Sequence, residues 1–218
     1  AGVEKLPQTI GIYPFSNSLA VIDGKNVTLY SRGISELISE NSSPLNLDAV
    51  SIAASSDSLF VLGADKSVAR YSAELKEETV ILASASDELG FFDSPSDVIT
   101  RKNKTYVADK NNNRIVVHDG ENYSAVTGEL FRPVAVATDH TGNLYVAYSE
   151  SKIAVFDATG NRLTNPSEET VFVSNDESGA KNTSKVAIKD LKCNSKGALY
   201  LLSKSGGIFV RESGKDAF

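Results

Sequence analysis

Apolar and polar positions follow one another along this chain in short runs rather than in long periodic stretches. The clearest example lies between residues 131 and 157, where apolar runs at 133–138, 144–147 and 153–156 are separated by polar turns. Residues 93–119 repeat the same order of runs and turns. Runs of this length, rich in Val, Ile and aromatic residues and bounded by Gly, Asn and Asp, predict β-strands joined by hairpins.

The same pattern occurs five times. Its most constant part is an aliphatic-aromatic core, which lies at residues 19–22, 59–62, 105–108, 144–147 and 199–202. The spacing is about 40–45 residues with a longer last step, and strands at this spacing are typical of β-propeller blades. The sequence therefore predicts an all-β fold, with residues 1–218 forming a single β-propeller domain of four-stranded antiparallel blades. Five blades are expected; six blades, or part of a larger propeller, are the alternatives.

Some elements of the repeat are less regular. Small residues are common in the first strand of several copies, which suits inner strands that crowd together. Fourth strands are expected at 78–82, 124–126 and 170–173, and residues 33–40 suit a short helical turn or a strand equally. Two polar segments, 83–94 and 163–185, interrupt the repeat. The second is expected to be a loop on a binding face, or else a tolerated surface insertion.

Composition narrows the classes of function. The chain has 218 residues, 41% of them hydrophobic, and a net charge of −6. This acidic balance argues against a nucleic-acid partner, which requires a basic face. No apolar run is long enough to predict a transmembrane segment. The single cysteine cannot form a disulfide within the chain. The lack of methionine suggests a processed or excised chain, which keeps a secreted or cell-surface location open.

Residues 92–162 resemble NHL repeats. The motif of that family reads Pro-x-Gly-Ile-Ala-Val-Asp, then Gly-Asn-Ile-Tyr-Val-Ala-Asp, then Asn-Asn-Arg-Ile-x-Val-Phe. In this chain, Thr105-Tyr-Val-Ala-Asp-Lys-Asn-Asn-Asn-Arg-Ile-Val-Val-His118 and Arg132-Pro-Val-Ala-Val-Ala-Thr-Asp139 follow it. The resemblance implies a β-propeller and leaves the function open, because propellers of this kind host both binding modules and enzymes.

Charged turns provide the candidate binding residues. The turns between second and third strands lie at the same end of a propeller, and four of the five carry an acidic residue followed closely by a lysine. We expect these turns to form a ring of alternating charge that binds a protein or peptide, unless they are simply solvated. The residues are Asp23, Lys25, Asp65, Lys66, Asp109, Lys110, Asn111, Glu150 and Lys152.

Catalytic chemistry has less support. A zinc site needs several His or Cys ligands, and the only histidines are His118, expected in the core, and His140, expected in an exposed turn. Calcium needs only oxygen ligands, and the acids at or near first strands are Asp48, Asp97 and Asp190. No nucleophile elbow or phosphate-binding loop is present.

These patterns favour a non-catalytic interaction module that binds a protein or peptide through one loop-rich face and needs no cofactor. One alternative is a calcium-dependent hydrolase or lyase with its site in the axial channel. The other is a secreted or cell-surface fragment that acts in adhesion or as a spacer. The sequence predicts no oligomeric state.

Overall fold

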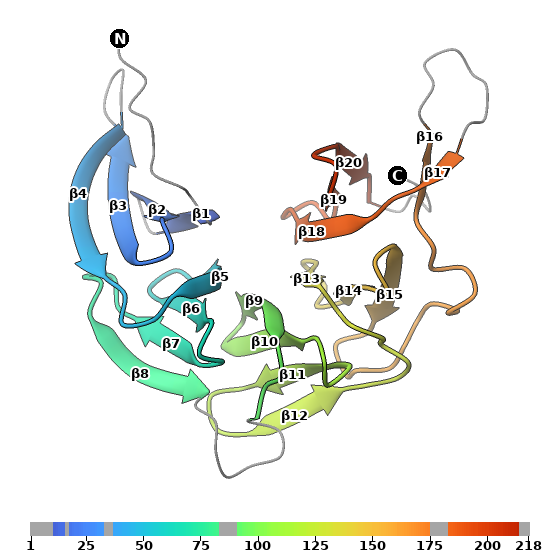
Figure 1. Ribbon diagram of the computed structural model, residues 1–218, viewed down its shortest axis with the longest axis horizontal. Coiled ribbons are helices and arrows are strands. Elements are labelled where there is room, and N and C mark those ends of the chain that lie inside the picture. Colours follow the sequence, from blue (N-terminus) through green and yellow to red (C-terminus); the bar gives the residue numbers. More distant parts are fainter. Residues whose placement is uncertain (1–10, 16–17, 33–36, 83–90, 175–182, 214–218) are drawn as a thin grey trace. The chain divides into compact units, whose positions relative to one another are not determined.

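The computed structural model describes residues 11–15, 18–32, 37–82, 91–174 and 183–213. All secondary structure in these ranges is β-strand, in antiparallel sheets. No helix in the described ranges is long and apolar enough to cross a membrane. Sequence-neighbouring strands pair within each sheet, so the five predicted repeats are five blades (Figure 1). The predicted all-β, five-bladed β-propeller is confirmed.

Blades one to three have four strands each. Blade one contains β1 (Gly11–Phe15), β2 (Ser18–Ile22), β3 (Asn26–Arg32) and β4 (Leu37–Pro44). Blade two contains β5 (Ala49–Ala54), β6 (Leu59–Gly63), β7 (Val68–Tyr71) and β8 (Glu77–Leu82). Blade three contains β9 (Pro95–Arg101), β10 (Lys104–Asp109), β11 (Arg114–His118) and β12 (Tyr123–Val126). Of the range 33–40, in which a turn or a strand was expected, residues 37–40 belong to the strand β4, and residues 33–36 lie outside the described residues.

Blades four and five have three strands each within the described residues. Blade four contains β13 (Ala135–Thr138), β14 (Leu144–Tyr148) and β15 (Lys152–Phe156), and blade five contains β18 (Ile188–Cys193), β19 (Leu199–Ser203) and β20 (Ile208–Arg211). The fourth strand expected at 170–173 is wrong. β16 (Phe172–Ser174) pairs instead with β17 (Thr183–Lys185). Isolated bridges from Arg162 to Phe156 and from Thr170 to Lys152 connect the preceding segment to blade four.

The chain forms two compact units, each with its own core. Unit 1 contains residues 1–105 and 118–123, and unit 2 contains residues 106–117 and 124–218. Core residues of unit 1 come from blades one and two and include Ile22, Leu59 and Tyr71. The core of unit 2 includes Ile188 and Leu201. All five residues of β6 are buried, as the continuous apolar run at 59–62 predicts for a strand covered on both faces.

Close strand packing explains one of the small residues in the first strands. A Cβ atom on Gly11 of β1 would lie 2.8 Å from Cγ2 of Ile52 on β5, so any larger side chain would force these strands apart. This contact agrees with the expectation that small residues allow inner strands to crowd together.

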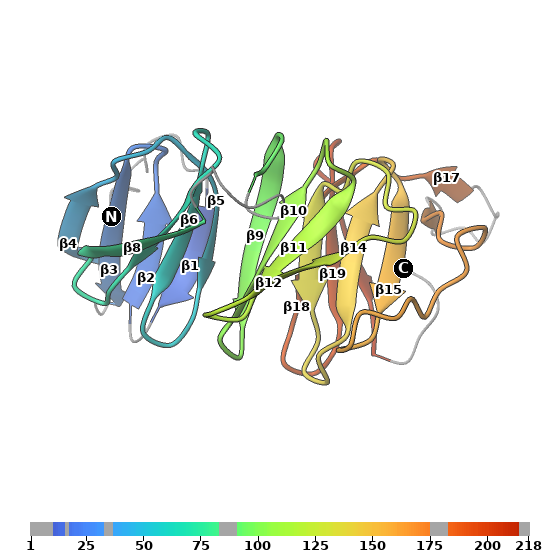
Figure 2. The ribbon, with the colours of Figure 1, turned by 90° about the horizontal axis from the view of Figure 1, so that it is seen from below.

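The strands run up and down, so each blade has two different ends (Figure 2). We call one the linker end: it carries the turns between second and third strands together with the segments that join one blade to the next. The opposite, hairpin end carries the turns between first and second and between third and fourth strands. Hydrogen bonds tie the linker-end segments together within each unit, for example from Ala64 N to Asp48 O (2.8 Å) and from Lys204 N to Ala187 O (2.8 Å).

Candidate functional site

The charged turns of unit 1 lie at the linker end, but their acids and lysines do not pair within each turn. Asp23 Oδ1 accepts hydrogen bonds from Lys25 N (3.1 Å) and Asn26 N (2.7 Å). Burial would raise the pKa of Asp23, yet these donors outweigh it and lower the pKa below its ordinary value. Lys25 Nζ instead lies 4.0 Å from Asp48 Oδ1 on the following linker. The acid therefore shapes the turn, and the lysine reaches the neighbouring segment.

In the next turn of unit 1, the acid again accepts hydrogen bonds within the turn, and the lysine again lies near the following segment. Asp65 Oδ1 accepts hydrogen bonds from Ser67 N (3.1 Å) and Ser67 Oγ (2.7 Å). Lys66 Nζ lies 3.6 Å from Asp93 Oδ1 and 5.4 Å from the centre of the Phe91 ring. All of these residues remain at least partly exposed.

In unit 2, Asp109 differs from the other predicted binding residues because its side chain has 0% exposure. Its Oδ2 atom accepts hydrogen bonds from Arg114 Nε and Asn112 Nδ2, both at 2.8 Å. Asp109 therefore holds its turn together and presents no charge to a partner. Lys110, which follows it, is half-buried, and Asn111 is fully at the surface.

The remaining predicted residues of unit 2 lie in the turn that follows β14. Glu150 is exposed, and its Oε1 atom lies 3.6 Å from Lys204 Nζ of the next blade's turn. Lys152 Nζ donates to Pro166 O at 2.7 Å and lies 5.8 Å from the centre of the Tyr148 ring. Whether any of these residues binds a partner stays a prediction.

An exposed aromatic residue, Phe131, lies between these two turns of unit 2. Its side chain is 61% exposed. Its carbonyl oxygen accepts hydrogen bonds from Ser149 N (2.8 Å) and Ser149 Oγ (3.3 Å). The next residue, Arg132, donates its N–H to Asn113 Oδ1 at 2.9 Å. The loop that carries Phe131 is thus fastened to the turns on both sides of it.

The backbone around Phe131 is held in an unfavourable conformation. Glu129 and Arg132 have φ angles of 61° and 53°, and Ser149 and Glu150 have φ angles of 47° and 68°. Residues other than glycine rarely adopt positive φ, and such strain persists only where the surrounding structure imposes it. We call Phe131, Arg132, Glu150 and Asn111 the Phe131 surface. Of these four residues, the sequence predicts only Asn111 and Glu150 as binding residues, whereas Phe131 and Arg132 stand in it only as the start of a repeat.

The three candidate calcium ligands each have protein partners. Asp48 is exposed and lies near Lys25, as described above. Asp97 is buried and accepts hydrogen bonds from Ser51 Oγ (2.7 Å) and Val98 N (2.9 Å). Asp190 Oδ1 lies 2.9 Å from Lys192 Nζ. Within the described residues, no three His, Cys, Asp or Glu side chains form a group that could hold a metal ion.

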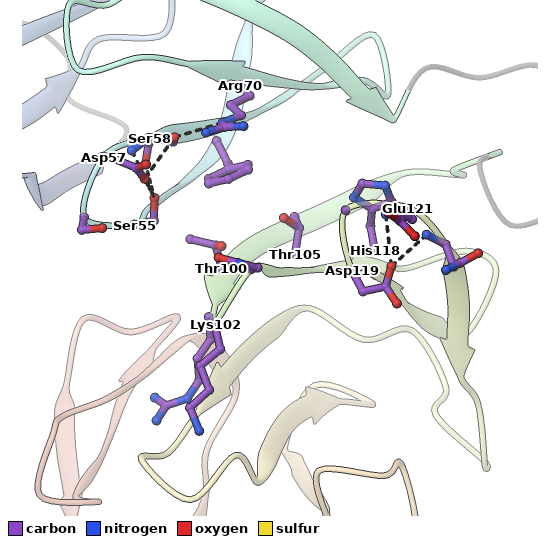
Figure 3. Close-up of a pocket in the computed structure, with 16 residues that line it drawn as sticks. Ser55, Asp57, Ser58, Arg70, Thr100, Lys102, Thr105, His118, Asp119 and Glu121 are labelled. Carbon is purple, nitrogen blue, oxygen red and sulfur yellow. Dashed lines mark hydrogen bonds between the residues drawn. The ribbon is translucent and has the colours of Figure 1, made fainter.

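A polar hollow of about 1130 Å³ lies at the hairpin end of unit 1 (Figure 3). Three turns line it: residues 55–58 between β5 and β6, residues 101–103 between β9 and β10, and residues 119–122 between β11 and β12. The floor includes the buried side chains of Phe60 and Thr105. All lining residues belong to unit 1. No motif marked this hollow in the sequence, because its turns are far apart along the chain.

His118 lines the hollow and does not lie in the core, so the expectation of core packing is wrong. It is half-buried, and its ring centre lies 4.7 Å from that of Tyr123. Burial lowers the pKa of His118 more than the nearby Asp119 raises it, so the imidazole is neutral at pH 7. His140, expected in an exposed turn, is exposed.

Part of the long polar segment of unit 2 is built into blade four. Glu169 is buried and accepts hydrogen bonds from Arg162 Nε (2.9 Å), Thr164 Oγ1 and Tyr148 Oη. Its backbone carbonyl accepts from Ile153 N of β15 at 3.0 Å. Residues 162–171 therefore cover the edge of β15, where blades one to three have a fourth strand. This part of the segment is structural, so its removal would damage blade four.

Comparisons with known proteins agree with the fold. No model of a protein family matches the chain, and no curated protein matches it either. A solved structure of U3-55K is 12% identical, with a TM-score of 0.63, and the match covers 91% of this chain and 60% of that one. The crystal structure of RRP9 WD40 repeats is 11% identical, with a TM-score of 0.64 and coverage of 91% and 59%.

The chain thus spans about 60% of the length of those two structures. At such low identity, the likeness shows the β-propeller fold alone. It does not distinguish NHL repeats from the WD40 repeats of the second structure.

Proposed function

We propose that this chain is a non-catalytic interaction module that binds a protein or peptide at the linker end of unit 2, through the Phe131 surface. The observation that carries the proposal is the exposed Phe131 ring on a loop whose backbone is fixed. A single exposed apolar side chain is ordinary on a protein surface. Here, however, hydrogen bonds from Ser149 and to Asn113 hold the loop on both sides, at the cost of two strained φ angles.

A fixed aromatic side chain beside an arginine suits protein recognition. Aromatic residues and arginine are enriched among the residues that carry most of the binding energy at interfaces. An anchor that is already ordered also loses little conformational freedom when it binds. Arg132, Glu150 and Asn111 would supply the polar rim around Phe131. We expect a protein or peptide partner and no nucleic acid, because the net charge of the chain is −6.

We also propose that the repeats are of the NHL type. The supporting observation is that Asn112 and Arg114, at the motif positions of the third copy, both donate hydrogen bonds to the buried carboxylate of Asp109. In the fourth copy, Asp139 plays a comparable part, accepting from Thr141 N, Gly142 N and Asn143 N. The motif would then specify turn geometry and not the binding surface.

Site-specific photo-crosslinking tests the interaction function. A photoreactive amino acid would replace Phe131 in one protein and Leu163 in another, because Leu163 is similarly exposed (58%) and lies at the hairpin end of the same unit. We expect the protein with the photoreactive residue at position 131 to give one discrete crosslinked product. The protein with that residue at position 163 should give no product of the same mass.

The partner so identified would then be titrated against Phe131→Ala and Leu163→Ala. Loss of an aromatic anchor costs more than about 2 kcal/mol, which weakens binding more than ten-fold. The Leu163 variant should bind as the wild type does. Equal affinities for all three proteins would refute the Phe131 surface as the binding site, provided that their melting temperatures are the same.

A further inference from the structure

The hollow at the hairpin end of unit 1 has an uneven distribution of charge. Its β9–β10 turn carries Arg101 and Lys102, and its β11–β12 turn carries Asp119 and Glu121. Figure 3 shows Asp119 and Glu121 together with His118 on one side, Ser55, Asp57 and Ser58 on another, and Thr100 and Thr105 between them. The hollow therefore offers a cationic rim and an acidic rim rather than a surface of one sign.

The acidic rim is held in place by its own backbone. Asp119 Oδ1 accepts hydrogen bonds from Asn122 N (2.8 Å) and Glu121 N (3.1 Å). These two donors lower the pKa of Asp119, so its carboxylate stays charged at neutral pH. On the opposite side, Arg70 Nε donates to Ser58 Oγ at 3.0 Å and lies 3.3 Å from Glu78 Oε2. Arg70 therefore already has a hydrogen-bond partner and an ion-pair partner within blade two.

The cationic rim, in contrast, has no ion-pair partner among the residues that the structure describes. Arg101 Nε is buried from solvent and makes no hydrogen bond within the described part of the chain. Neither Arg101 nor Lys102 forms an ion pair there. A buried donor without an acceptor is destabilising, and more so when the group is charged. A ligand that supplies an acceptor to Arg101 would recover this free energy.

The backbone of the turn that carries these two cations has a defined shape. Lys102 and Asn103 have φ angles of 47° and 63°, which is the geometry of a tight two-residue hairpin turn. Thr100 Oγ1 donates to Lys104 O at 3.2 Å across the base of the turn. The turn thus has one well-defined shape before any ligand arrives, which limits the entropy lost on binding.

We infer that the hollow is a second recognition site, which binds a short peptide segment through a side-chain carboxylate held by Arg101 and Lys102. Guanidinium pairs with the planar carboxylate through two parallel hydrogen bonds. The acidic rim disfavours a dianionic phosphate or a polyanion and favours a basic side chain elsewhere on the same peptide. The hydroxyl groups of Ser55, Ser56 and Thr100 would meet its polar backbone. The expectation that the ligand is a peptide rests on the proposed interaction function, but the hollow is separate from the Phe131 surface.

Nuclear magnetic resonance tests this site, because the Nε–H group of arginine gives its own signal. The probe is the peptide acetyl-Ser-Asp-Ser-Lys-Ser-amide, titrated into the full chain to millimolar concentration. Two comparison peptides replace Asp by Asn or by phosphoserine. The Arg101 signal is assigned by its absence in Arg101→Lys, which keeps the positive charge and removes the guanidinium. We expect the Arg101 signal to move and saturate with the Asp peptide and to move little with the other two.

The variants then give the expected size of the effect. A hydrogen bond to a charged group contributes about 1.5–3 kcal/mol, so Arg101→Lys should weaken binding of the Asp peptide at least about ten-fold. Lys196→Gln, which removes an exposed cation of unit 2 that does not line the hollow, should leave it unchanged. Unchanged binding by Arg101→Lys, equal binding of the Asn peptide, tighter binding of the phosphoserine peptide, or no shift at all would each overturn the inference.

Failure of this site and failure of the proposed function can be told apart. Phe131→Ala should keep the Arg101 shift, because Phe131 does not line the hollow. Loss of partner binding in Phe131→Ala with the shift retained supports both proposals. The shift without any dependence of partner binding on Phe131 supports the hollow alone and refutes the Phe131 surface.

Discussion

Glu169 connects segment 162–171 to blade four, and its replacement should destabilise unit 2 strongly. Its side chain is 1% exposed, and Arg162 Nη2 approaches Glu169 Oε2 to 2.5 Å. Glu169→Ala leaves the Arg162 guanidinium and the Tyr148 hydroxyl without their shared acceptor. Breaking a buried pair from one side costs about 3–5 kcal/mol. Arg162 is 15% exposed and keeps Gly128 O as an acceptor, so we expect about 3 kcal/mol, the lower end of this range.

The assay is thermal unfolding with a set of matched variants. For a chain of this size, about 3 kcal/mol corresponds to a fall in melting temperature of about 6–12 °C. Glu169→Gln keeps the shape and an acceptor oxygen but loses the charge, so it should lose about half as much. Glu168→Gln changes the exposed neighbour and should stay within about 0.5 kcal/mol of the wild type. A fall of less than about 2 °C in Glu169→Ala would refute the reasoning.

Hydrogen exchange would show whether the loss is local. Ile153 N donates to Glu169 O, and Val171 N donates to Ser151 O at 2.8 Å. Both amides should exchange faster in Glu169→Ala, because segment 162–171 would open away from β15. The amides of blade two, which belongs to unit 1, serve as the internal control. Uniform acceleration in both units would contradict a local role.

The stability that Glu169 provides should also depend on pH. Burial would raise its pKa, but Arg162, Thr164 and Tyr148 donate to the carboxylate and hold its pKa below the ordinary 4.5. The contribution is therefore fully present above about pH 4.5 and is lost as the pH falls through the lower, folded-state pKa. The same environment raises the pKa of Tyr148 to about 12, so its hydroxyl stays a donor throughout this range. The difference in melting temperature between wild type and Glu169→Gln should narrow on acidification; widening would contradict the assignment.

Two further predictions use the same melting assay. Asp109→Ala should cost about 3 kcal/mol because the Nε–H group of Arg114, whose side chain is 13% exposed, loses the Asp109 carboxylate. The exposed Asn111→Ala on the same turn should stay within about 0.5 kcal/mol, and equally small effects of the two changes would show that Asp109 is not structural. Calcium at 1 mM should change the melting temperature by less than about 1 °C relative to EDTA, because an ion stabilises only a fold that binds it. A rise of many degrees would favour the calcium-dependent alternative and lead to variants of Asp48, Asp97 and Asp190.

The strands could be predicted because their signal is local. Each second strand is an apolar run that its neighbours cover on both faces, as β6 and its five buried residues show. The outer strand β4 carries the polar sequence Leu-Ile-Ser-Glu-Asn-Ser-Ser-Pro, which has no such run. Its position depends on pairing with β3, including a contact of 3.1 Å between Thr28 Oγ1 and Ser42 Oγ. An outer strand of this kind is specified by its neighbour more than by its own residues.

The candidate sites could be predicted only in part, because they depend on contacts between distant residues. The position of Phe131 is set by Asn113 and Ser149, which lie 18 residues or more from the atoms they bind. The hollow likewise combines three turns from blades two and three. Asp109 was expected to face a partner because it begins a charged turn, and only its contact with Arg114 shows otherwise. The position of a turn in the sequence predicts where a charged residue lies, but not which group pairs with it.

Hydrogen-bond and ion-pair partners show which charged residues of the turns have a structural role. Acids in the turns, such as Asp23 and Asp139, accept hydrogen bonds from backbone N–H groups two to four residues later and so fix the turn. Lys25 and Lys66 then lie near acids of the next linker. The turn next to Arg101 differs, because it consists of Lys102 and Asn103 and contains no acidic residue. In the site proposed above, Arg101 would bind the carboxylate of another molecule.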